Sequence, residues 1–470
     1  MNSALRVLVV GCGLMLSACQ MVGPNYHMPW NAAINRADIK DDLPINSNVI
    51  SAPVPQNWWK MYQDPRLDAL VQQALITNSD LRVASANLSK ARIEVLEAQS
   101  QGGFGASASA GAQRIQESGE AFLQTEKLPV ATFTSASVNL SYQFDLWGTL
   151  KRGVEASQAS ADAAQAAADT ARITVVAQVV RAYTQVCAAN EEYGIARHSL
   201  DLQEEGVKLT QRLRDAGRGD ETQVTRSQTQ FKSLRAELPR YEALRQGGLF
   251  QLSMLLAKPV NQLPAGTGDC AELPRIAQVL PVGNGAELIK RRPDIRQAER
   301  LLAASTARIG VAIGELYPNI SFGATVGSVG QSNNFGHPAS DRWAFGPLIS
   351  WTVPTSGARA RISEAKVETQ ASLAHFDGVV LNALRETQTA LVDYEAVLER
   401  RDALADAEES AHRAADQTHQ FFQMGRESFL ADLQATRTYT DVRGQLSAAN
   451  TQVAMQQINL FLALGGGWEK

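Results

Sequence analysis

The sequence predicts an α+β membrane protein built from two similar halves, each with a medium helix, two strands and a hairpin of two very long helices. Three observations support this. Short motifs recur in the same order at an offset of roughly 205 to 218 positions, which is typical of an internal repeat. Proline is absent between Pro129 and Pro239 and after Pro354, so helices can run unbroken there. Four segments of about ten residues alternate apolar and polar side chains.

The N-terminus has the features of a lipoprotein leader. Residues 1–18 contain an apolar run that begins at Leu5, and Leu16-Ser17-Ala18 comes directly before Cys19. We expect residues 1–18 to be a signal peptide and Cys19 to become the lipidated first mature residue. A plain secretory signal with a chance cysteine is the alternative. Gln20, where an Asp would favour inner-membrane retention, favours the outer membrane. Residues 19–58 are then a lipidated N-terminal extension.

The repeats divide the remaining chain. We assign 59–256 to the first repeat, 257–283 to a linker in an equatorial region, 284–464 to the second repeat and 465–470 to a tail. Asp80-Leu81-Arg82 recurs as Asp294-Ile295-Arg296, and Ala216-Gly217-Arg218 recurs as Met424-Gly425-Arg426. Medium helices are predicted over about 79–101 and 293–316, and helical hairpins over about 148–256 and 357–464. The first helix of each hairpin would be on the order of 100 Å long.

Four strands are predicted, at about 104–113, 131–147, 319–329 and 343–354. Val138, Leu140 and Tyr142 alternate with polar residues, which gives one apolar face. A soluble sandwich is the alternative. Apart from the leader, no window reaches the length of apolar residues that a spanning helix needs, so the mature chain can cross a membrane only as strands. Membrane barrels need at least about eight strands and tolerate no open edge, so several chains must share one barrel.

Motifs along the whole mature chain then point to a family. They are Val22-Gly23-Pro24-Asn25-Tyr26, Trp58-Trp59 with Asp64-Pro65, Tyr142-Gln143-Phe144-Asp145-Leu146-Trp147-Gly148, and Arg291-Arg292-Pro293-Asp294-Ile295 followed by Ile309-Gly310 and Tyr317-Pro318. With these motifs the chain resembles the TolC-type outer-membrane factor family, and within it the lipidated NodT-like branch.

The resemblance implies a homotrimer with a twelve-stranded transmembrane β-barrel, continuous with a twelve-helix periplasmic α-barrel. It implies a passive duct of a tripartite efflux pump in the cell outer membrane that exports small molecules. The implied partners are a periplasmic adaptor and an inner-membrane pump, commonly of the resistance-nodulation-division type. Two other readings stay open: the outer-membrane channel of a protein secretion system, and a lipid-anchored periplasmic coiled-coil scaffold.

In this family the helical tips are drawn together by hydrogen bonds and salt bridges, and opening them admits substrate. By position, the tips here are the turns around Gly217 and Gly425. The candidate gate residues are Arg214, Asp215, Gly217, Arg218, Asp220, Glu221, Asp416, Gln420, Gly425, Arg426, Glu427 and Asp432. Solvated turn charges are the alternative reading. Many relatives place acidic residues just after the tip glycine, but Gln223, Ala431 and Gln434 stand there. A cation-selective acidic ring is therefore expected only if Asp432 or Asp416 supplies it.

Other patterns in the sequence are weaker indications of function. His412, Asp416 and His419 share a helix face and could bind a transition metal, although solvated side chains are the favoured reading. The sequence has no nucleophile-base-acid arrangement and no phosphate loop, so we expect no enzyme, no cofactor and no nucleic-acid partner. A disulfide between Cys187 and Cys270 is possible, but nothing in the sequence indicates it.

Overall fold

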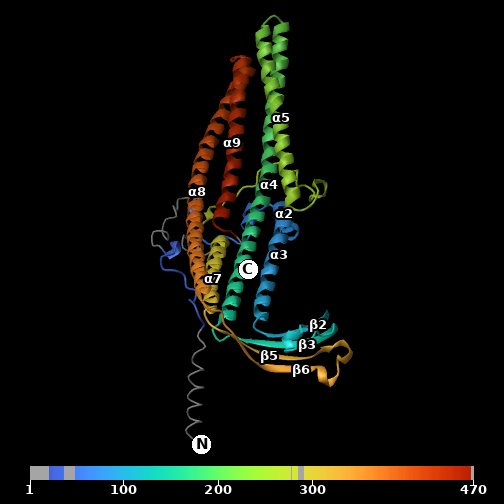
Figure 1. Cartoon of the computed structure of the whole chain (residues 1–470). Coiled ribbons are helices and arrows are strands. Elements are labelled where there is room, and N and C mark those ends of the chain that lie inside the picture. Colours follow the sequence, from blue (N-terminus) through green and yellow to red (C-terminus); the bar gives the residue numbers. More distant parts are fainter. Residues whose placement is uncertain (1–20, 36–47, 277, 284–290, 467–470) are drawn as a thin grey trace. The chain divides into compact units, whose positions relative to one another are not determined.

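The computed structural model describes residues 21–35, 48–276, 278–283 and 291–466 (Figure 1). The expected signal peptide and Cys19 lie outside these residues. The α-helices are α2 (Pro65–Thr77), α3 (Ser79–Ser100), α4 (Thr149–Asp215), α5 (Glu221–Leu255), α7 (Pro293–Gly314), α8 (Ser356–Gln423) and α9 (Phe429–Ala463). The strands are β1 (Val49–Ile50), β2 (Phe104–Ile115), β3 (Ala131–Phe144), β4 (Leu280–Pro281), β5 (Asn319–Gln331) and β6 (Asp341–Ser350).

The described residues fall into two compact units. One is built from residues 1–30, 87–164 and 297–376 and carries the large sheet. The other is built from residues 31–86, 165–296 and 377–470 and carries the helical hairpins. None of the helices in the described ranges combines the length and the apolar character that crossing a membrane requires.

The large sheet has four strands in the order β2-β3-β5-β6, and all neighbours are antiparallel. Its register places apolar side chains opposite one another across all four strands. One such row is Ala108, Val138, Val326 and Trp343, and another is Phe104, Tyr142, Phe322 and Pro347. Directly paired residues point to the same face of a sheet. The sheet therefore has one continuous apolar face.

The opposite face of the sheet is polar. Ser109 and Ser137 are paired and their hydroxyl oxygens lie 3.0 Å apart, while the Thr325 hydroxyl donates to the Asn139 carboxamide at 2.8 Å. Both faces are largely open: every residue of β2 except Ile115 is exposed. A soluble sheet would cover its apolar face with a core, and the residues that the structure describes place none against it.

Each half of the large sheet leads directly into a very long helix. α4 has 67 residues and α8 has 68, which corresponds to about 100 Å for each at 1.5 Å per residue. At the first junction, β3 ends at Phe144, three residues before the expected end, because the Asp145 carboxylate accepts hydrogen bonds from the backbone N–H groups of Leu150 and Lys151. Asp145 thus satisfies free N–H groups at the start of α4.

The main apolar core lies in the unit of the helical hairpins. It gathers residues of α2, α4, α5, α8 and α9 around the short helix η3 (Trp58–Tyr62). Trp58 is fully enclosed and stacks on Phe461 of α9, with ring centroids 4.7 Å apart. Tyr183 of α4 is also buried and donates to the Asp64 carboxylate at 2.7 Å. Both hairpins contribute residues to this core.

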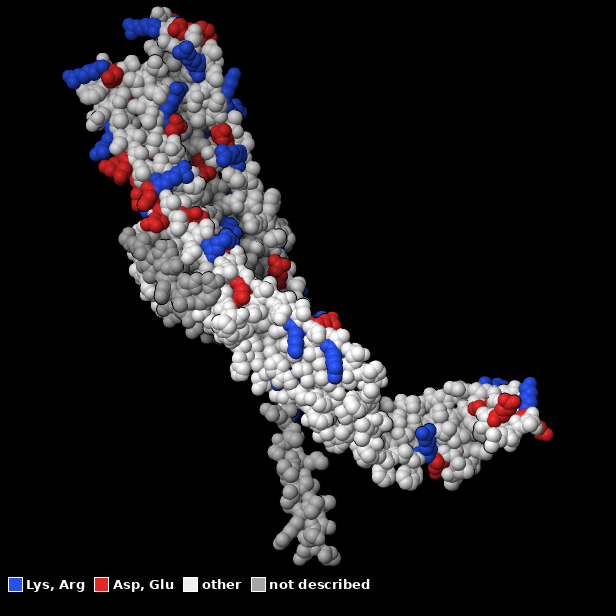
Figure 2. Space-filling view, turned by 60° about the vertical axis from the view of Figure 1, so that its left-hand side comes forward, with Lys and Arg blue, Asp and Glu red and all other residues white. Residues whose placement is uncertain are grey.

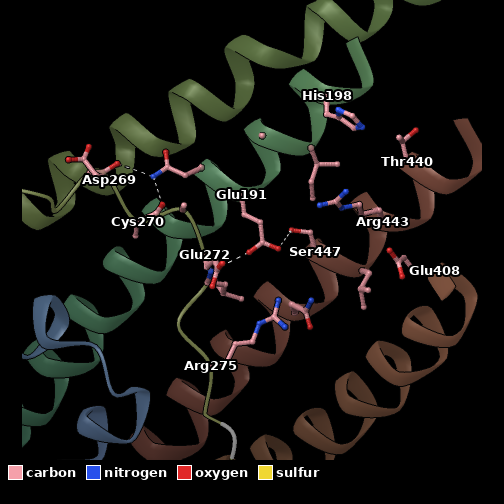
Figure 3. A pocket seen from close by; sticks show the side chains of 18 residues that line it. Glu191, His198, Asp269, Cys270, Glu272, Arg275, Glu408, Thr440, Arg443 and Ser447 are labelled. Atoms are coloured by element: carbon pink, nitrogen blue, oxygen red, sulfur yellow. Dashed lines mark hydrogen bonds between the residues drawn. The ribbon is translucent and has the colours of Figure 1, made fainter. Parts of the chain in front are cut away.

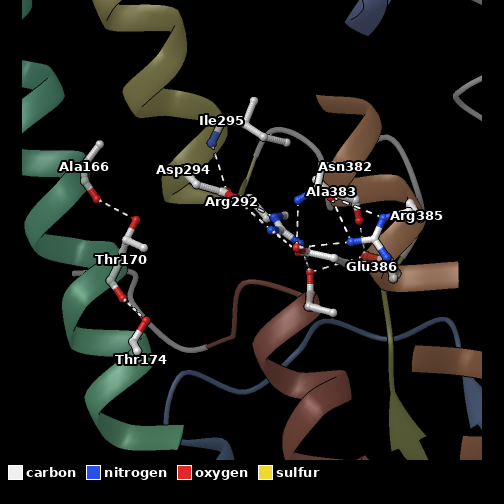
Figure 4. Close-up of polar contacts among 12 residues, drawn as sticks. Ala166, Thr170, Thr174, Arg292, Asp294, Ile295, Asn382, Ala383, Arg385 and Glu386 are labelled. Atoms are coloured by element: carbon white, nitrogen blue, oxygen red, sulfur yellow. Dashed lines mark hydrogen bonds and ion pairs between the residues drawn. The ribbon is translucent and has the colours of Figure 1, made fainter. Parts of the chain in front are cut away.

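Equivalent contacts close the two repeats at this level. In the first repeat, the Asn78 carboxamide donates to the carbonyl of Leu255 at the end of α5, at 2.9 Å. In the second, the corresponding Arg292 donates to the carbonyl of Ala463 at the end of α9, at 2.7 Å, and pairs with Asp294 and Glu386 (Figure 4). The recurring Asp-Leu-Arg and Asp-Ile-Arg motifs thus begin helices that are tied to the last helix of their own repeat.

The N-terminal segment is fixed in the unit that carries the sheet. The Arg152 side chain of α4 is buried and donates to the carbonyls of Val22 and Gly23 and to the Asn25 carboxamide. A Cβ on Gly23, whose φ is +86°, would meet the backbone of Gly310 at 2.5 Å. The Val-Gly-Pro-Asn motif is therefore a docking segment that needs glycine for close approach.

Candidate functional site

The first candidate site is the turn that joins α4 and α5. Gly217 has a φ of +69°, its N–H donates to the carbonyl of Arg214, and the N–H of Arg218 donates to the carbonyl of Leu213. These two hydrogen bonds form a Schellman motif, the usual way to end a helix on glycine. The Asp220 side chain then accepts the N–H of Gln223 and starts α5.

The charges of this turn pair within their own hairpin. Arg214 contacts Asp215 at 2.7 Å and Glu221 at 3.0 Å; the two carboxylate side chains are largely exposed, and the Arg214 side chain is 39% exposed. These hydrogen bonds raise the pKa of the Arg214 guanidinium, first through Asp215 and then through Glu221. Such exposed pairs add little stability.

The turn between α8 and α9 repeats the same backbone pattern. Gly425 also has a φ of +69°, and the N–H groups of Gly425 and Arg426 donate to the carbonyls of Phe422 and Phe421. Ser428 caps α9 by accepting the N–H of Ala431. The two tips are thus equivalent in backbone, although their side chains differ.

Asp432 differs from the other tip acids because it is buried. Its Oδ2 lies 3.2 Å from Nδ1 of His419 on α8, and Nε2 of His419 lies 2.9 Å from the Gln423 carboxamide. Oδ1 of Asp432 is enclosed without a hydrogen-bond partner. His412 pairs instead with the exposed Asp416, at 3.4 Å. The predicted His412, Asp416 and His419 face is thus divided between two contacts, and the described residues contain no cluster of three metal-binding side chains.

A buried polar contact between the two hairpins lies further from the tips, at Gln203 of α4. Its buried carboxamide donates to the carbonyl and the hydroxyl of Ser227 on α5, both at 3.0 Å. Its oxygen accepts two hydrogen bonds from the Arg437 guanidinium of α9, at 3.1 and 2.7 Å. Burial lowers the pKa of Arg437, opposed by the charge of Asp441. One side chain therefore joins three of the four hairpin helices.

A pocket of about 1160 Å³ lies in the same unit, between α4, α9 and the linker that follows α5 (Figure 3). The side chains of Glu191, Glu272, Arg275 and Arg443 face it. Its charges are mixed, and Glu191 is already engaged by the Leu273 N–H and the Ser447 hydroxyl. The pocket therefore has the character of a solvated groove between packed elements.

Comparison with known proteins gives the family. The sequence model described as "Outer membrane efflux protein" matches residues 70–258 and 285–466, one stretch in each repeat. The chain belongs to this family. The probable efflux pump outer membrane protein TtgC of Pseudomonas putida is 28% identical over 480 residues, which cover all of this chain and 96% of that protein. Nodulation protein T of Rhizobium leguminosarum bv. trifolii is 28% identical, covering 97% and 96%.

Solved outer-membrane channels have the same fold. The outer-membrane channel OprN is 31% identical, covers 95% of this chain and 99% of its own, and superposes with a TM-score of 0.86. The CmeC outer membrane channel of Campylobacter jejuni gives a TM-score of 0.81 at 19% identity, covering 95% of each chain. The predicted resemblance to TolC-type outer-membrane factors is therefore confirmed.

Within this outer membrane efflux protein, the structure separates the candidate gate residues into three groups. Arg214 contacts both Asp215 and Glu221, and Asp432 contacts His419. Gly217, Asp220 and Gly425 shape the turns. Arg218, Asp416, Gln420, Arg426 and Glu427 are exposed at or near them. Sequence reasoning missed Gln203 and Arg437, which lie about three to four helical turns from the glycines. No local signal marks them.

Proposed function

We propose that three copies of this outer-membrane efflux channel protein form the exit duct of a tripartite efflux pump. The duct is passive and exports small molecules that a periplasmic adaptor and an inner-membrane transporter deliver. The observation that carries the proposal is the direct continuation of each strand pair into a helix of 67 or 68 residues. Strands suited to a membrane thereby lead into helices long enough to reach far into the periplasm.

The strands have the composition of membrane-spanning strands. Residues 104–113, 131–144, 319–331 and 343–350 contain no charged residue, and charges gather at the loop-bearing end of the sheet (Figure 2). Aromatic side chains lie toward both ends of the apolar face, with Trp343 and Phe345 near the loops and Phe104, Tyr142 and Phe322 near the helices. A charge-free apolar band between aromatic girdles is the pattern of an outer-membrane barrel.

The free edges of the sheet support a shared barrel. Among the described residues, β2 and β6 each have one pairing edge with no strand beside it, and such an edge is not tolerated in lipid. An alternating order of four antiparallel strands leaves β2 and β6 running in opposite directions. Each β6 can therefore pair with the β2 of the next copy without breaking the pattern. Three copies give twelve strands.

The exposure of α3 supports a helical partner from another copy. Only Val95 of its 22 residues is buried, while Val83, Ile93 and Leu96 are each at least 59% exposed. Large apolar side chains on one exposed helix favour coverage by protein. In a trimer, α3 of one copy would be covered by its neighbour.

The remaining parts of the proposal concern the anchor, the tips and the partners. Cys19 would carry the lipid, and the Arg152 contacts would hold the following segment beside the sheet. The tip residues would form the periplasmic entrance, with the Gln203 contact controlling how far the hairpins separate. TtgC is named as a probable efflux pump outer membrane protein. For this chain we propose an inner-membrane pump of the resistance-nodulation-division type.

The test is the accumulation of a fluorescent amphiphile in cells that lack other outer-membrane channels. The chain is produced together with each candidate adaptor and pump. We expect accumulation to fall when the chain is present and to recover when a protonophore removes the driving force. Unchanged accumulation with every pump tested would contradict drug efflux and would favour the secretion-channel reading.

A further inference from the structure

The linker after α5 is joined covalently to the middle of α4. Cys187 of α4 and Cys270 of the linker form a disulfide across a sequence separation of 83 residues. Both side chains are buried, with 0% and 1% of their surface exposed. The chain between them contains the rest of α4, the first tip and all of α5. The bond therefore closes a covalent ring around the base of the first hairpin.

Hydrogen bonds extend this attachment along the linker. The Asn190 carboxamide, one turn beyond Cys187, donates to the carbonyls of Gly268 and Cys270 at 2.9 and 2.8 Å. The Glu191 carboxylate accepts the N–H of Leu273 at 3.2 Å and the Ser447 hydroxyl of α9 at 3.1 Å. The linker is held in this way as one wall of the pocket between α4 and α9 (Figure 3).

The second hairpin has no equivalent bond. The sequence contains four cysteines, and Cys12 and Cys19 both precede the first repeat. The base of the α8–α9 hairpin is closed only by noncovalent contacts such as those of Arg292. The two hairpins, which are alike in length and in their tips, therefore differ in how firmly their bases are fixed.

We propose that the Cys187–Cys270 disulfide is a structural clamp that a periplasmic dithiol oxidase installs during folding, and that it fixes the linker to α4. Two thiols lose two protons and two electrons as the S–S bond forms, and the oxidase disulfide accepts them to become a dithiol. Because both cysteines are buried in the main apolar core of the folded chain, the bond must form before this core closes. The clamp rests on the proposed function only in one respect, namely that these residues lie in the periplasm.

The connectivity is tested on purified wild-type protein by brief cleavage with an arginine-specific protease. Cleavage at the exposed Arg218 of the first tip gives two pieces, each with one of the two cysteines. We expect these pieces to migrate together on a denaturing gel without reductant and to separate with reductant. Cleavage at Arg426 of the second tip is the matched control, since the fragment 427–470 should leave under both conditions. Separation of the Arg218 pieces without reductant would overturn the proposal.

The role of the oxidase is tested in cells that lack the periplasmic dithiol oxidase. Alkylation with a maleimide-polymer reagent counts thiols relative to the double variant Cys187→Ser/Cys270→Ser. We expect the wild-type chain to gain two reactive thiols in these cells and its trimer level to fall several-fold. The double variant should be equally low in both strains. A disulfide formed without the oxidase, or a double variant as abundant as wild type, would contradict the clamp.

These outcomes do not depend on transport. A chain that passes both tests and still fails to lower amphiphile accumulation would refute the proposed function and leave the clamp intact. A chain that exports the amphiphile while Cys187 and Cys270 are free thiols would support the proposed function and refute the clamp.

Discussion

Gln203 has a larger effect than its size suggests because it satisfies groups on two hairpins at once. Its carboxamide is buried, and the Arg437 guanidinium that donates hydrogen bonds to it is half-buried. A buried donor that loses its acceptor costs about 1–3 kcal/mol, and more if it is charged. Near the tips, the α4–α9 contact thus uses this buried amide group rather than the exposed ion pairs, while the Glu191–Ser447 and Arg181–Asn459 hydrogen bonds join the same helices further from the tips.

We predict that Gln203→Leu loosens α9 from α4 and raises the conductance of the duct in planar bilayers severalfold, because Arg437 loses both hydrogen bonds. Gln203→Glu is the matched control. It keeps an acceptor for Arg437 and loses only the donation to Ser227, so its conductance should stay near that of the wild type. Equal conductance in the wild type and both variants would show that the Gln203–Arg437 contact does not control the opening of the duct.

At the scale of single residues, the sequence predicted positions better than partners. The glycines at 217 and 425 were found because a helix that ends in a tight turn favours glycine. Gln203 and Arg437 are 234 positions apart, and both lie in long helices whose polar residues are spread around the axis. The Cys187–Cys270 pair was not indicated either, because 83 positions separate the two cysteines and Cys270 lies in the linker after α5. Only the packed hairpins bring these residues together.

At the scale of elements, the start of α2 shows how one carboxylate stabilises a helix and the core together. Asp64 accepts the Arg66 N–H at 2.9 Å and the Tyr183 hydroxyl at 2.7 Å. Burial raises the pKa of Asp64, but the hydrogen bonds from Tyr183 and Arg66 outweigh burial and hold the pKa below its usual value. A lowered folded-state pKa stabilises the fold above the unfolded-state pKa.

We predict that this contribution is lost in acid. Asp64→Asn carries no charge and has one oxygen where Asp64 uses two, so it can accept from Arg66 or from Tyr183 but not from both. At pH 7 the wild type should unfold at a temperature about 2 °C or more above the variant. The difference should shrink as the pH falls below about 3.9, the unfolded-state pKa of aspartate, because protonation then costs the folded state its advantage. Thermal unfolding in detergent between pH 3 and 7 measures it. A difference that grows on acidification would contradict the assignment.

The ends of elements were less predictable than their existence. The alternation of apolar and polar residues extends the predicted strand 131–147 to Trp147. β3 nevertheless ends at Phe144, because the Asp145 carboxylate accepts hydrogen bonds at the start of α4. Likewise β6 spans Asp341–Ser350 rather than about 343–354. Hydrophobic pattern alone does not register a side chain that competes for backbone N–H groups.

At the scale of the molecule, the repeat carried most of the prediction. Two copies of one plan require two strand pairs and two hairpins, and the structure has both. The order β2-β3-β5-β6 was not predictable from either half alone, because it depends on which strands meet between the repeats. That order decides which edges remain open and therefore where a second copy can join.

The last prediction concerns the open edges of β2 and β6, which the proposed shared barrel joins between copies. Ser109 of β2 and Arg342 of β6 both point to the polar face, since Ser109 pairs with Ser137, Ser137 with Gly327 and Gly327 with Arg342. If β6 of one copy pairs with β2 of the next, cysteines on the two edges come close only between copies. We expect Ser109→Cys, combined with Arg342→Cys or Ala344→Cys, to give a covalent trimer on oxidation in the membrane.

The central strands provide the matched control for this experiment. Asn139 and Thr325 are directly paired within one chain, so Asn139→Cys/Thr325→Cys should cross-link only inside the monomer. A trimer from the edge pair and a monomer from the central pair would establish that the open edges are joined by neighbouring copies. Covalent dimers that never extend to trimers would exclude a ring of three, because a closed ring of antiparallel strands leaves no edge unpaired.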